Sequence, residues 1–262
     1  MAVIVITGST RGIGLGLARA FAERGHNVVI SSRGASAVDR ALTALNGAGS
    51  GRVAGFACDV SESTQVVRLW DLAKAEFGTI DIWINNAGTS GPRRNVVDLE
   101  DAEVAGVVAT NLIGTVNGMR TALRGMVAQG HGKIFNFEGF GSDGMSAPGL
   151  SVYGATKRAI TYLTESTNKE IKGSPVLLGT ISPGIVVTDL LDDARDADPA
   201  QWARTKKFYN ILGDRVETIV PFITDRVLAA DRPGTAIRWL TRRRAFWRFL
   251  TASMTRRKVM PD

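Results

Sequence analysis

The sequence predicts an α/β fold, a single domain built on one doubly wound parallel sheet with helices on both faces. Three observations support this fold class. Short runs rich in Val and Ile, bounded by Gly, Asn or Asp, recur along the chain. Segments of helical length, with apolar residues every three or four positions, separate these runs. The runs are almost continuously apolar, as expected of strands covered by helices on both faces.

The predicted elements follow one another in a regular order. Strands are expected at residues 3–6, 27–30, 53–56, 80–84, 133–137 and 176–181, with a candidate seventh strand at 235–240. Helices are expected at residues 14–23, 35–45, 63–77, 102–127 and 151–172. This βαβαβα order predicts a Rossmann-type sheet, in which ligands bind beyond the carboxyl ends of the strands. Functional residues are therefore expected just after each strand.

Length and composition limit the class of protein. The 262 residues are 44% apolar and 22% charged, enough for one sizeable core. Cys58 is the only cysteine, so no internal disulfide forms, and a reducing compartment, the cytoplasm, is expected. No basic leader and no apolar run of roughly 18 residues is present, so we expect a soluble, untargeted protein. His26 and His131 have no thiol or carboxylate at ligand spacing, and no metal site is predicted.

The net charge of +7 is concentrated at one end of the chain. Residues 226–262 hold nine arginines and one lysine against two aspartates, a balance of +8 that leaves about −1 for the rest. A nearly neutral body with a basic tail argues against a protein built around nucleic acid.

A glycine-rich loop follows the first predicted strand and opens a helix. Glycines permit a tight turn, and they let a pyrophosphate approach the amides of a helix N-terminus where no Cβ intervenes. The spacing differs from G-x-G-x-x-G, so a plain strand-to-helix turn is the alternative. The candidate cofactor residues here are Gly8, Thr10, Arg11, Gly12, Ile13 and Gly14.

The second predicted strand ends without an acidic residue. An NAD-selective site is expected to carry an acid there for the ribose 2′-hydroxyl. Arg33 stands in that place, and with Arg11 it would neutralise a 2′-phosphate by charge-assisted hydrogen bonds. NADP(H) is therefore favoured over NAD(H), with two solvated surface arginines as the alternative.

Two further strand ends carry candidate cofactor contacts. Asp59 and Val60 follow the third strand, where a carboxylate would accept from adenine and an apolar side chain would pack on the ring, although Asp59 equally suits a helix N-cap. Asn86, Ala87 and Gly88 follow the fourth strand, where they either continue the backbone contact with a dinucleotide or close a loop.

Tyr153 and Lys157 are the candidate acid/base pair. They stand four residues apart on a predicted helix, so their side chains project from one face. A phenol titrates near 10, and a neighbouring cation is expected to lower that pKa toward the working range of a general acid or base. Such a pair alone is weak, because a tyrosine packed at a surface edge gives the same pattern.

Taken together, these residues resemble the short-chain dehydrogenase/reductase family over residues 2 to about 191. The resemblance implies that Tyr153 is the catalytic acid/base, that Lys157 lowers its pKa and contacts ribose, and that Asn111 holds a water of the proton relay in an interrupted helix. It also implies hydride transfer from nicotinamide to a carbonyl carbon, and usually a homodimer or homotetramer formed through helices 102–127 and 151–172. The nicotinamide-side wall would comprise Pro183, Gly184, Val186 and Thr188.

One departure from the family pattern concerns the substrate oxygen. Most members place a serine about 13 residues before the tyrosine, whereas Glu138 and Gly139 occupy that place here. Either Ser142 swings in to replace it, or Tyr153 stabilises the oxygen alone. The same residues resemble the chlorophyll b reductase branch, which implies NADPH-dependent reduction of a formyl group on a large apolar molecule. The alternative function is a catalytically silent NADP(H)-sensing regulator.

The last third of the chain is expected to serve the substrate. We divide the domain into a dinucleotide-binding and catalytic core (1–189), a substrate lid (190–232) and a basic C-terminal extension (233–262). In the lid, aromatic residues either face an apolar ligand or pack in a core; they are Trp202, Phe208, Tyr209 and Phe222. The arginines and aromatics of residues 242–250 suit a solvated helix, a subunit interface or peripheral contact with an anionic membrane.

Overall fold

The computed structural model describes residues 1–188, 199–255 and 257–260. At its centre is a sheet of strand order β3-β2-β1-β4-β5-β6-β9, in which every neighbouring pair is parallel. The strands are β1 (Val3–Ile6), β2 (Asn27–Ser32), β3 (Val53–Ala57), β4 (Ile82–Asn85), β5 (Gly132–Phe137), β6 (Val176–Ser182) and β9 (Ala236–Arg238). The predicted doubly wound α/β fold is confirmed, and the candidate seventh strand is β9.

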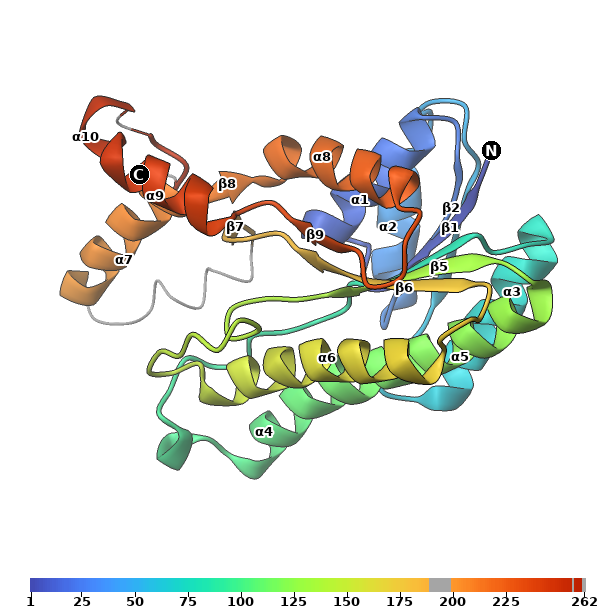
Figure 1. Ribbon diagram of the computed structural model, residues 1–262, viewed down its shortest axis with the longest axis horizontal. Coiled ribbons are helices and arrows are strands. Elements are labelled where there is room, and N and C mark those ends of the chain that lie inside the picture. The colour runs from blue at the N-terminus through green and yellow to red at the C-terminus, as the bar shows by residue number, and fades with distance from the viewer. Residues whose placement is uncertain (189–198, 256, 261–262) are drawn as a thin grey trace.

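Helices cover both faces of the sheet (Figure 1). One face carries α1 (Gly12–Glu23), α2 (Ala35–Leu45) and α8 (Val216–Ala229), and the other carries α3 (Ser63–Phe77), α5 (Gly114–Gln129) and α6 (Ser151–Glu170). Each face has its own apolar cluster, with Phe21 in the first and Trp83 in the second. These two layers hold the carboxyl ends of the strands in fixed register.

The long helix predicted at residues 102–127 is interrupted. It consists of α4 (Asp101–Val108), a π-helical turn η2 (Ala109–Ile113) and α5, preceded by the short 3₁₀ turn η1 (Val96–Asp98). The wider π turn sits in the middle of an otherwise continuous helix, a placement common at functional sites. It contains Asn111, whose side chain is completely buried.

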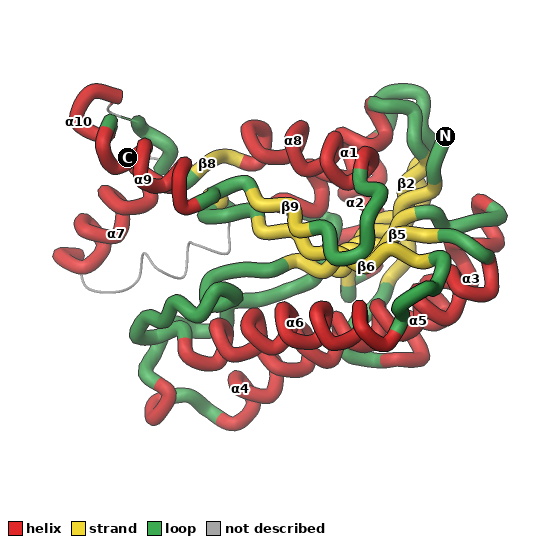
Figure 2. Tube along the Cα trace, in the orientation of Figure 1, coloured by secondary structure: helices red, strands yellow, loops and turns green. Residues whose placement is uncertain are grey.

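The C-terminal part of the chain forms a lobe beside the sheet (Figure 2). We call α7 (Pro199–Leu212), α9 (Arg242–Leu250) and α10 (Ala252–Thr255) the C-terminal lobe. The two-residue strands β7 (Val186–Val187) and β8 (Asp214–Arg215) pair beside it. No helix of the described residues is both long and apolar enough to cross a bilayer.

The aromatic residues expected in a lid divide between two roles. Tyr209 is buried, and Phe222 packs edge-on against Trp239 with ring centroids 5.2 Å apart, so both serve packing. Phe208 is partly exposed, and its ring centroid lies 6.1 Å from that of Phe249 of α9. The side chain of Trp202 lies outside the described residues.

Candidate active site

The glycine loop joins β1 to α1 at the carboxyl edge of the sheet. Gly8 and Gly12 adopt left-handed φ values of +61° and +54°, which L side chains rarely adopt. A Cβ on Gly8 would lie 2.7 Å from the Cα of Ala87, so the loop after β4 packs directly on this backbone. Arg11 occupies the N-cap of α1 and makes no side-chain capping bond, which suits the amides of the first turn to an anion. The loop therefore fits the pyrophosphate of a dinucleotide.

Thr7 and Asn86 fix the glycine loop to the loop after β4. The Thr7 hydroxyl accepts hydrogen bonds from the backbone amides of Asn86 and Ala87, each at 3.1 Å. The Asn86 amide Nδ2 donates to the carbonyls of Thr7 and Gly8, each at 2.9 Å. The side chain of Asn86 thus fixes the glycine loop by binding two of its backbone carbonyls. The sequence pattern did not specify this structural role.

The end of β2 carries the residues expected to select the cofactor. Arg33 directly follows β2 and is exposed, and Arg11 is exposed at the N-cap of α1, after the glycine loop that follows the neighbouring strand β1. Ser31, at the end of β2, donates its amide to Ser9 Oγ at 3.0 Å, which ties the strand end to the glycine loop. The two arginines thus flank one edge of the loop.

Asp59 forms a local turn after β3. Its Oδ1 accepts from the amide and the hydroxyl of Ser61, at 3.0 and 2.7 Å. Glu62, not Asp59, is the N-cap of α3, so the N-cap interpretation of Asp59 is wrong. Val60 is buried against Gly114, where an added Cβ would lie 2.5 Å from its Cγ2. The adenine contacts expected of Asp59 and Val60 stay predictions.

Tyr153 and Lys157 lie on one face of α6, next to the end of β5. The Lys157 ammonium is 5.8 Å from the centroid of the Tyr153 ring and donates to the carbonyl of Phe137 at 3.1 Å. A Cβ built on Gly139 would be 2.4 Å from Tyr153 Oη and 3.3 Å from Lys157 Cε. The missing side chain at Gly139 therefore makes the space that the tyrosine hydroxyl occupies.

Burial dominates the electrostatics of this pair. It raises the pKa of Tyr153 to about 12, although the Arg93 charge acts to lower it. It lowers the pKa of Lys157 to about 8, although nearby Glu138 acts to raise it. In the protein by itself, burial thus shifts the pKa of Tyr153 in the direction opposite to the lowering expected from a neighbouring cation, and the effect of Lys157 on the phenol stays a prediction. At neutral pH the pair is a neutral phenol beside an ammonium.

Asn111 connects the π turn with the loop after β4 and with α6. Its Oδ1 accepts from the Thr89 amide at 2.8 Å, and its Nδ2 donates to Thr89 O at 2.9 Å and to Thr156 Oγ1 at 3.1 Å. A Cβ on Gly88 would lie 3.3 Å from Asn111 Oδ1 and 3.6 Å from Lys157 Nζ. Both side chains therefore reach the same short stretch of backbone, and the relay water expected at Asn111 stays a prediction.

Ser142 is buried, and its hydroxyl bonds to backbone. Its Oγ accepts from the Gly139 amide at 3.0 Å and donates to the carbonyl of Lys157 at 3.3 Å. These bonds hold the loop after β5 against α6, so the Ser142 hydroxyl has a structural role. The catalytic role expected of Ser142 stays a prediction.

The segment after β6 meets the glycine loop. Gly184 has a φ of +74°, and an added Cβ would lie 2.6 Å from Leu240 Cβ. Val186 is buried in β7, and Thr188 packs beside Gly12, where an added Cβ would be 3.5 Å from Thr188 Cγ2. Pro183, Gly184, Val186 and Thr188 thus line one side of the same edge, while their nicotinamide contacts stay predictions.

Arg93 is a functional candidate that the sequence reasoning missed. Its Nη1 donates to Tyr209 Oη at 3.1 Å, and its charge reaches Tyr153. Its Nε is buried without a hydrogen-bond partner among the described residues. An arginine in a loop gives no sequence signal of this kind, because its neighbours come from α6 and α7.

Comparison with known proteins decides the family. A family model described as short chain dehydrogenase matches residues 2–199. This chain belongs to the short-chain dehydrogenase family. It is accordingly an oxidoreductase of carbonyl or alcohol groups that uses a nicotinamide cofactor. A solved short-chain type dehydrogenase/reductase from Mycobacterium marinum has a TM-score of 0.81 and 26% identity, over 90% of this chain and 92% of that chain.

Two plant relatives identify the branch of the short-chain dehydrogenase family. The chlorophyll(ide) b reductase NOL of Arabidopsis thaliana is 37% identical over 252 residues, which are 93% of this chain and 71% of the relative. The probable chlorophyll(ide) b reductase NYC1 of Oryza sativa subsp. japonica is 36% identical over 270 residues, 97% of this chain. The alignment covers only 52% of NYC1, so the chain corresponds to about half of that protein. The expected chlorophyll b reductase-like branch is confirmed.

The expected location needs correction. Both plant relatives are chloroplastic, which contradicts the cytoplasmic location expected from the sequence. The reason is that a low cysteine count indicates a reducing environment and does not distinguish one such compartment from another.

Possible metal ligands do not cluster in the described part of the chain. No group of three or more His, Cys, Asp or Glu side chains able to hold a metal ion occurs in residues 1–188, 199–255 and 257–260. His131 instead pairs with Asp81 at 3.0 Å, and His26 Nδ1 accepts from the Ala2 amide at 3.0 Å.

Proposed function

We propose that this short-chain dehydrogenase is an NADP(H)-dependent reductase that converts an aldehyde or ketone to an alcohol, with Tyr153 as the proton donor. The observation that carries the proposal is the neutral Tyr153 phenol held beside the Lys157 ammonium at the carboxyl edge of the sheet. Reduction of a carbonyl needs a group that is protonated before the reaction, and such a phenol is one. When bound, the nicotinamide cofactor supplies the hydride.

Lys157 has a second task in this proposal. Once Tyr153 has given its proton to the substrate oxygen, a phenolate is left in a buried site. The lowered pKa of Lys157, about 8, makes its ammonium a stronger acid than the phenol, whose pKa is about 12. The ammonium, which the Phe137 carbonyl holds at 3.1 Å, would therefore stabilise the phenolate and favour its reprotonation.

Arg93 supports the substrate oxygen where the family serine is absent. Gly139 offers no hydroxyl, and Ser142 bonds to backbone. Arg93 brings a positive charge close to Tyr153 and a buried Nε that has no partner among the described residues. A developing alkoxide would satisfy this donor. Loss of one oxyanion donor typically costs about 10²–10³ in rate, so Arg93→Met is expected to lower kcat by this factor while NADPH affinity stays unchanged.

The preference for NADP(H) rests on the arginines beside the glycine loop. Arg33 follows β2, Arg11 is the N-cap of α1 after the neighbouring strand β1, and β2 ends in two serines without an acid. A 2′-phosphate would draw charge-assisted bonds from both. NAD(H) has no 2′-phosphate for the Arg33 and Arg11 guanidinium groups to bind.

The substrate we infer is a formyl group on a large apolar, tetrapyrrole-like molecule. The support is the similarity to plant chlorophyll(ide) b reductases at 36–37% identity. The same fold accepts many substrates, so the test must compare large and small aldehyde substrates. Formyl-bearing tetrapyrroles are expected to give a higher kcat/KM than small aldehydes.

The deciding experiment follows NADPH consumption with a panel of aldehydes. We expect activity in the wild type and its loss in Tyr153→Phe, with NADPH binding retained. Tyr162→Phe is the matched control, because Tyr162 is 73% exposed on the same helix and the substitution removes only its hydroxyl. NADPH binding without turnover of any aldehyde or ketone would instead support the sensing regulator.

We also infer that the protein is a homodimer or homotetramer that associates through α5 and α6. These helices expose the apolar side chains of Val127 and Tyr162. Exposed apolar groups on neighbouring long helices suit an isologous interface. Analytical ultracentrifugation should show two or four chains, and a sedimenting monomer would contradict this.

A further inference from the structure

The helix α9 turns two of its four arginines toward the protein. Arg248 donates from its two terminal nitrogens, Nη1 and Nη2, to the buried carboxylate of Asp214, at 2.7 and 3.1 Å. Arg244, four residues earlier, stacks on Trp239 at 3.9 Å and donates to its carbonyl at 2.7 Å. The expectation of a helix whose arginines all lie in solvent is therefore wrong for these two. They form the inward stripe of α9.

Asp214 anchors this arrangement as a carboxylate. It is 2% exposed and also accepts from Arg257 and from Trp239 Nε1, each at 2.6 Å. Burial by itself raises the pKa of Asp214, but hydrogen bonds from Arg248, Trp239 and Arg257 and the Arg248 charge hold it below the usual value. The buried cluster around Asp214 thus fixes the orientation of α9, with the Phe208–Phe249 contact beside it.

The apolar side chains of α9 consequently face solvent. Phe246 is 63% exposed, Trp247 53% and Leu250 59%, and Phe249 is exposed beside them. Met254 of α10 continues this surface at 83% exposure. A helix that turns two arginines inward and exposes four large apolar side chains in one stretch marks a surface made for a partner.

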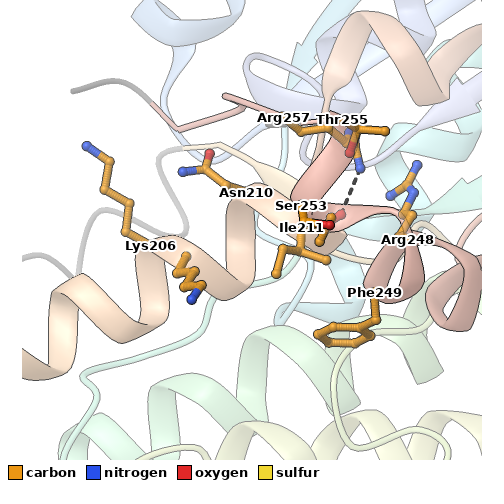
Figure 3. A pocket seen from close by; sticks show the side chains of 10 residues that line it. Lys206, Asn210, Ile211, Arg248, Phe249, Ser253, Thr255 and Arg257 are labelled. Atoms are coloured by element: carbon orange, nitrogen blue, oxygen red, sulfur yellow. Dashed lines mark hydrogen bonds between the residues drawn. The ribbon is translucent and has the colours of Figure 1, made fainter.

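The charges around this surface point to an anionic partner. Arg242 and Arg243, in the first turn of α9, are exposed, and residues 242–260 contain no Asp or Glu. A cavity of about 680 Å³ opens between α7 and α9 (Figure 3). Its walls carry cations, and Phe249 joins it to the apolar surface. The basic residues that line it are Lys206, Lys207, Arg248 and Arg257.

We propose that the C-terminal lobe docks on an anionic lipid bilayer, with Phe246, Trp247 and Leu250 entering the headgroup boundary. Amphipathic helices with aromatic and basic residues bind in this way, and anionic headgroups attract nearby arginines. A second copy of the chain fits less well, because a two-fold contact would bring acid-free basic surfaces together.

The test is co-sedimentation of the full chain with vesicles of phosphatidylcholine, with and without phosphatidylglycerol. Wild type should sediment with the anionic vesicles and bind the neutral ones much more weakly. The double variant Phe246→Ser, Leu250→Ser should lose at least about tenfold in partitioning. The matched control is Val96→Ser, Val97→Ser, which removes two exposed apolar side chains elsewhere and should bind as wild type.

The charge component is tested separately. Arg242→Gln, Arg243→Gln should weaken binding to anionic vesicles about 30-fold and leave neutral vesicles unaffected, because each surface cation contributes about a factor of five. Added salt should have a similar effect. Far-ultraviolet circular dichroism confirms that each variant is folded.

Two results would overturn the proposal. One is equal sedimentation of wild type and Phe246→Ser, Leu250→Ser with anionic vesicles. The other is wild type that stays in the supernatant but forms an oligomer which these two substitutions dissociate. That second result would make the surface an interface between copies.

Discussion

Substitution of Gly139 tests how closely the active site is fitted around Tyr153. Gly139 has no positive φ that would exclude a side chain, so Gly139→Ala changes sterics alone. The added Cβ would lie 2.4 Å from Tyr153 Oη. Ordinary contacts of a Cβ begin at 3.4 Å, so the hydroxyl must move by about 1 Å.

A displacement of this size has a calculable cost. Misplacement of a reacting group by about 1 Å lowers rates by about 10²-fold, equivalent to about 2.7 kcal/mol in the barrier. Overpacking in a fitted core costs a further 1–3 kcal/mol of stability, roughly. We therefore expect Gly139→Ala to lose about 10² in kcat while NADPH affinity stays near wild type, because the glycine loop is untouched.

The assay is steady-state NADPH oxidation with a saturating aldehyde, alongside fluorescence titration of NADPH and urea unfolding. Gly106→Ala is the matched control, since nothing lies within 4 Å of an added Cβ in that helical position. It should leave kcat unchanged and stabilise α4 by roughly 0.5–1 kcal/mol. Gly139→Ser should not rescue activity, because it carries the same Cβ. A Gly139→Ala enzyme within twofold of wild-type kcat would refute the placement of Tyr153.

Four further predictions follow from the charges of Lys157, Asp214 and Arg33. Lys157→Met should abolish turnover yet raise the free energy of unfolding at pH 7 by about 2 kcal/mol. The drop of the Lys157 pKa from 10.5 to about 8 on folding costs the wild type about 3 kcal/mol, which the variant recovers. Loss of the hydrogen bond to the Phe137 carbonyl offsets about 1 kcal/mol of this gain. Wild-type stability should also rise between pH 8 and 10.5, where the unfolded chain binds more protons, and urea titrations of Lys157→Met should lack this rise. Asp214→Asn should lower stability by about 2–4 kcal/mol and speed tryptic release of the lobe, because Arg248 loses its buried counter-charge; unchanged digestion would contradict the anchor. Arg33→Asp should raise the Kd of NADPH about tenfold or more in fluorescence titrations and leave that of NADH unchanged or lower; equal shifts would remove Arg33 from cofactor selection.

Much of the fold was predictable because local pattern and tertiary environment agree. The run at 3–6 and the helices at 35–45 and 63–77 have the predicted bounds, and the other strands differ by one or two residues at their ends. Such runs are buried on both faces, so composition alone identifies them. The glycine loop and the spacing of Tyr153 and Lys157 were also predictable from the sequence, because both patterns involve residues close together in the chain.

The remainder depends on contacts between distant segments. The π turn at Asn111 is stabilised by Thr89 and Thr156, from two other elements, and no local pattern indicates it. The pKa order of Tyr153 and Lys157 reflects burial, which the sequence does not reveal. The inward direction of Arg248 in α9 depends on Asp214, which is 34 residues away in the chain. In these places long-range geometry decides the chemistry.

The central claim is that Tyr153 protonates a carbonyl oxygen while hydride arrives from NADPH. The most direct measurement uses NADPH deuterated at the transferring position and mass spectrometry of the alcohol formed from a formyl substrate. Wild type is predicted to give an alcohol carrying one deuterium, and Tyr153→Phe to bind the same cofactor with little product. Labelled alcohol formed at wild-type rate by Tyr153→Phe, or no alcohol from any carbonyl with the wild type, would contradict the account.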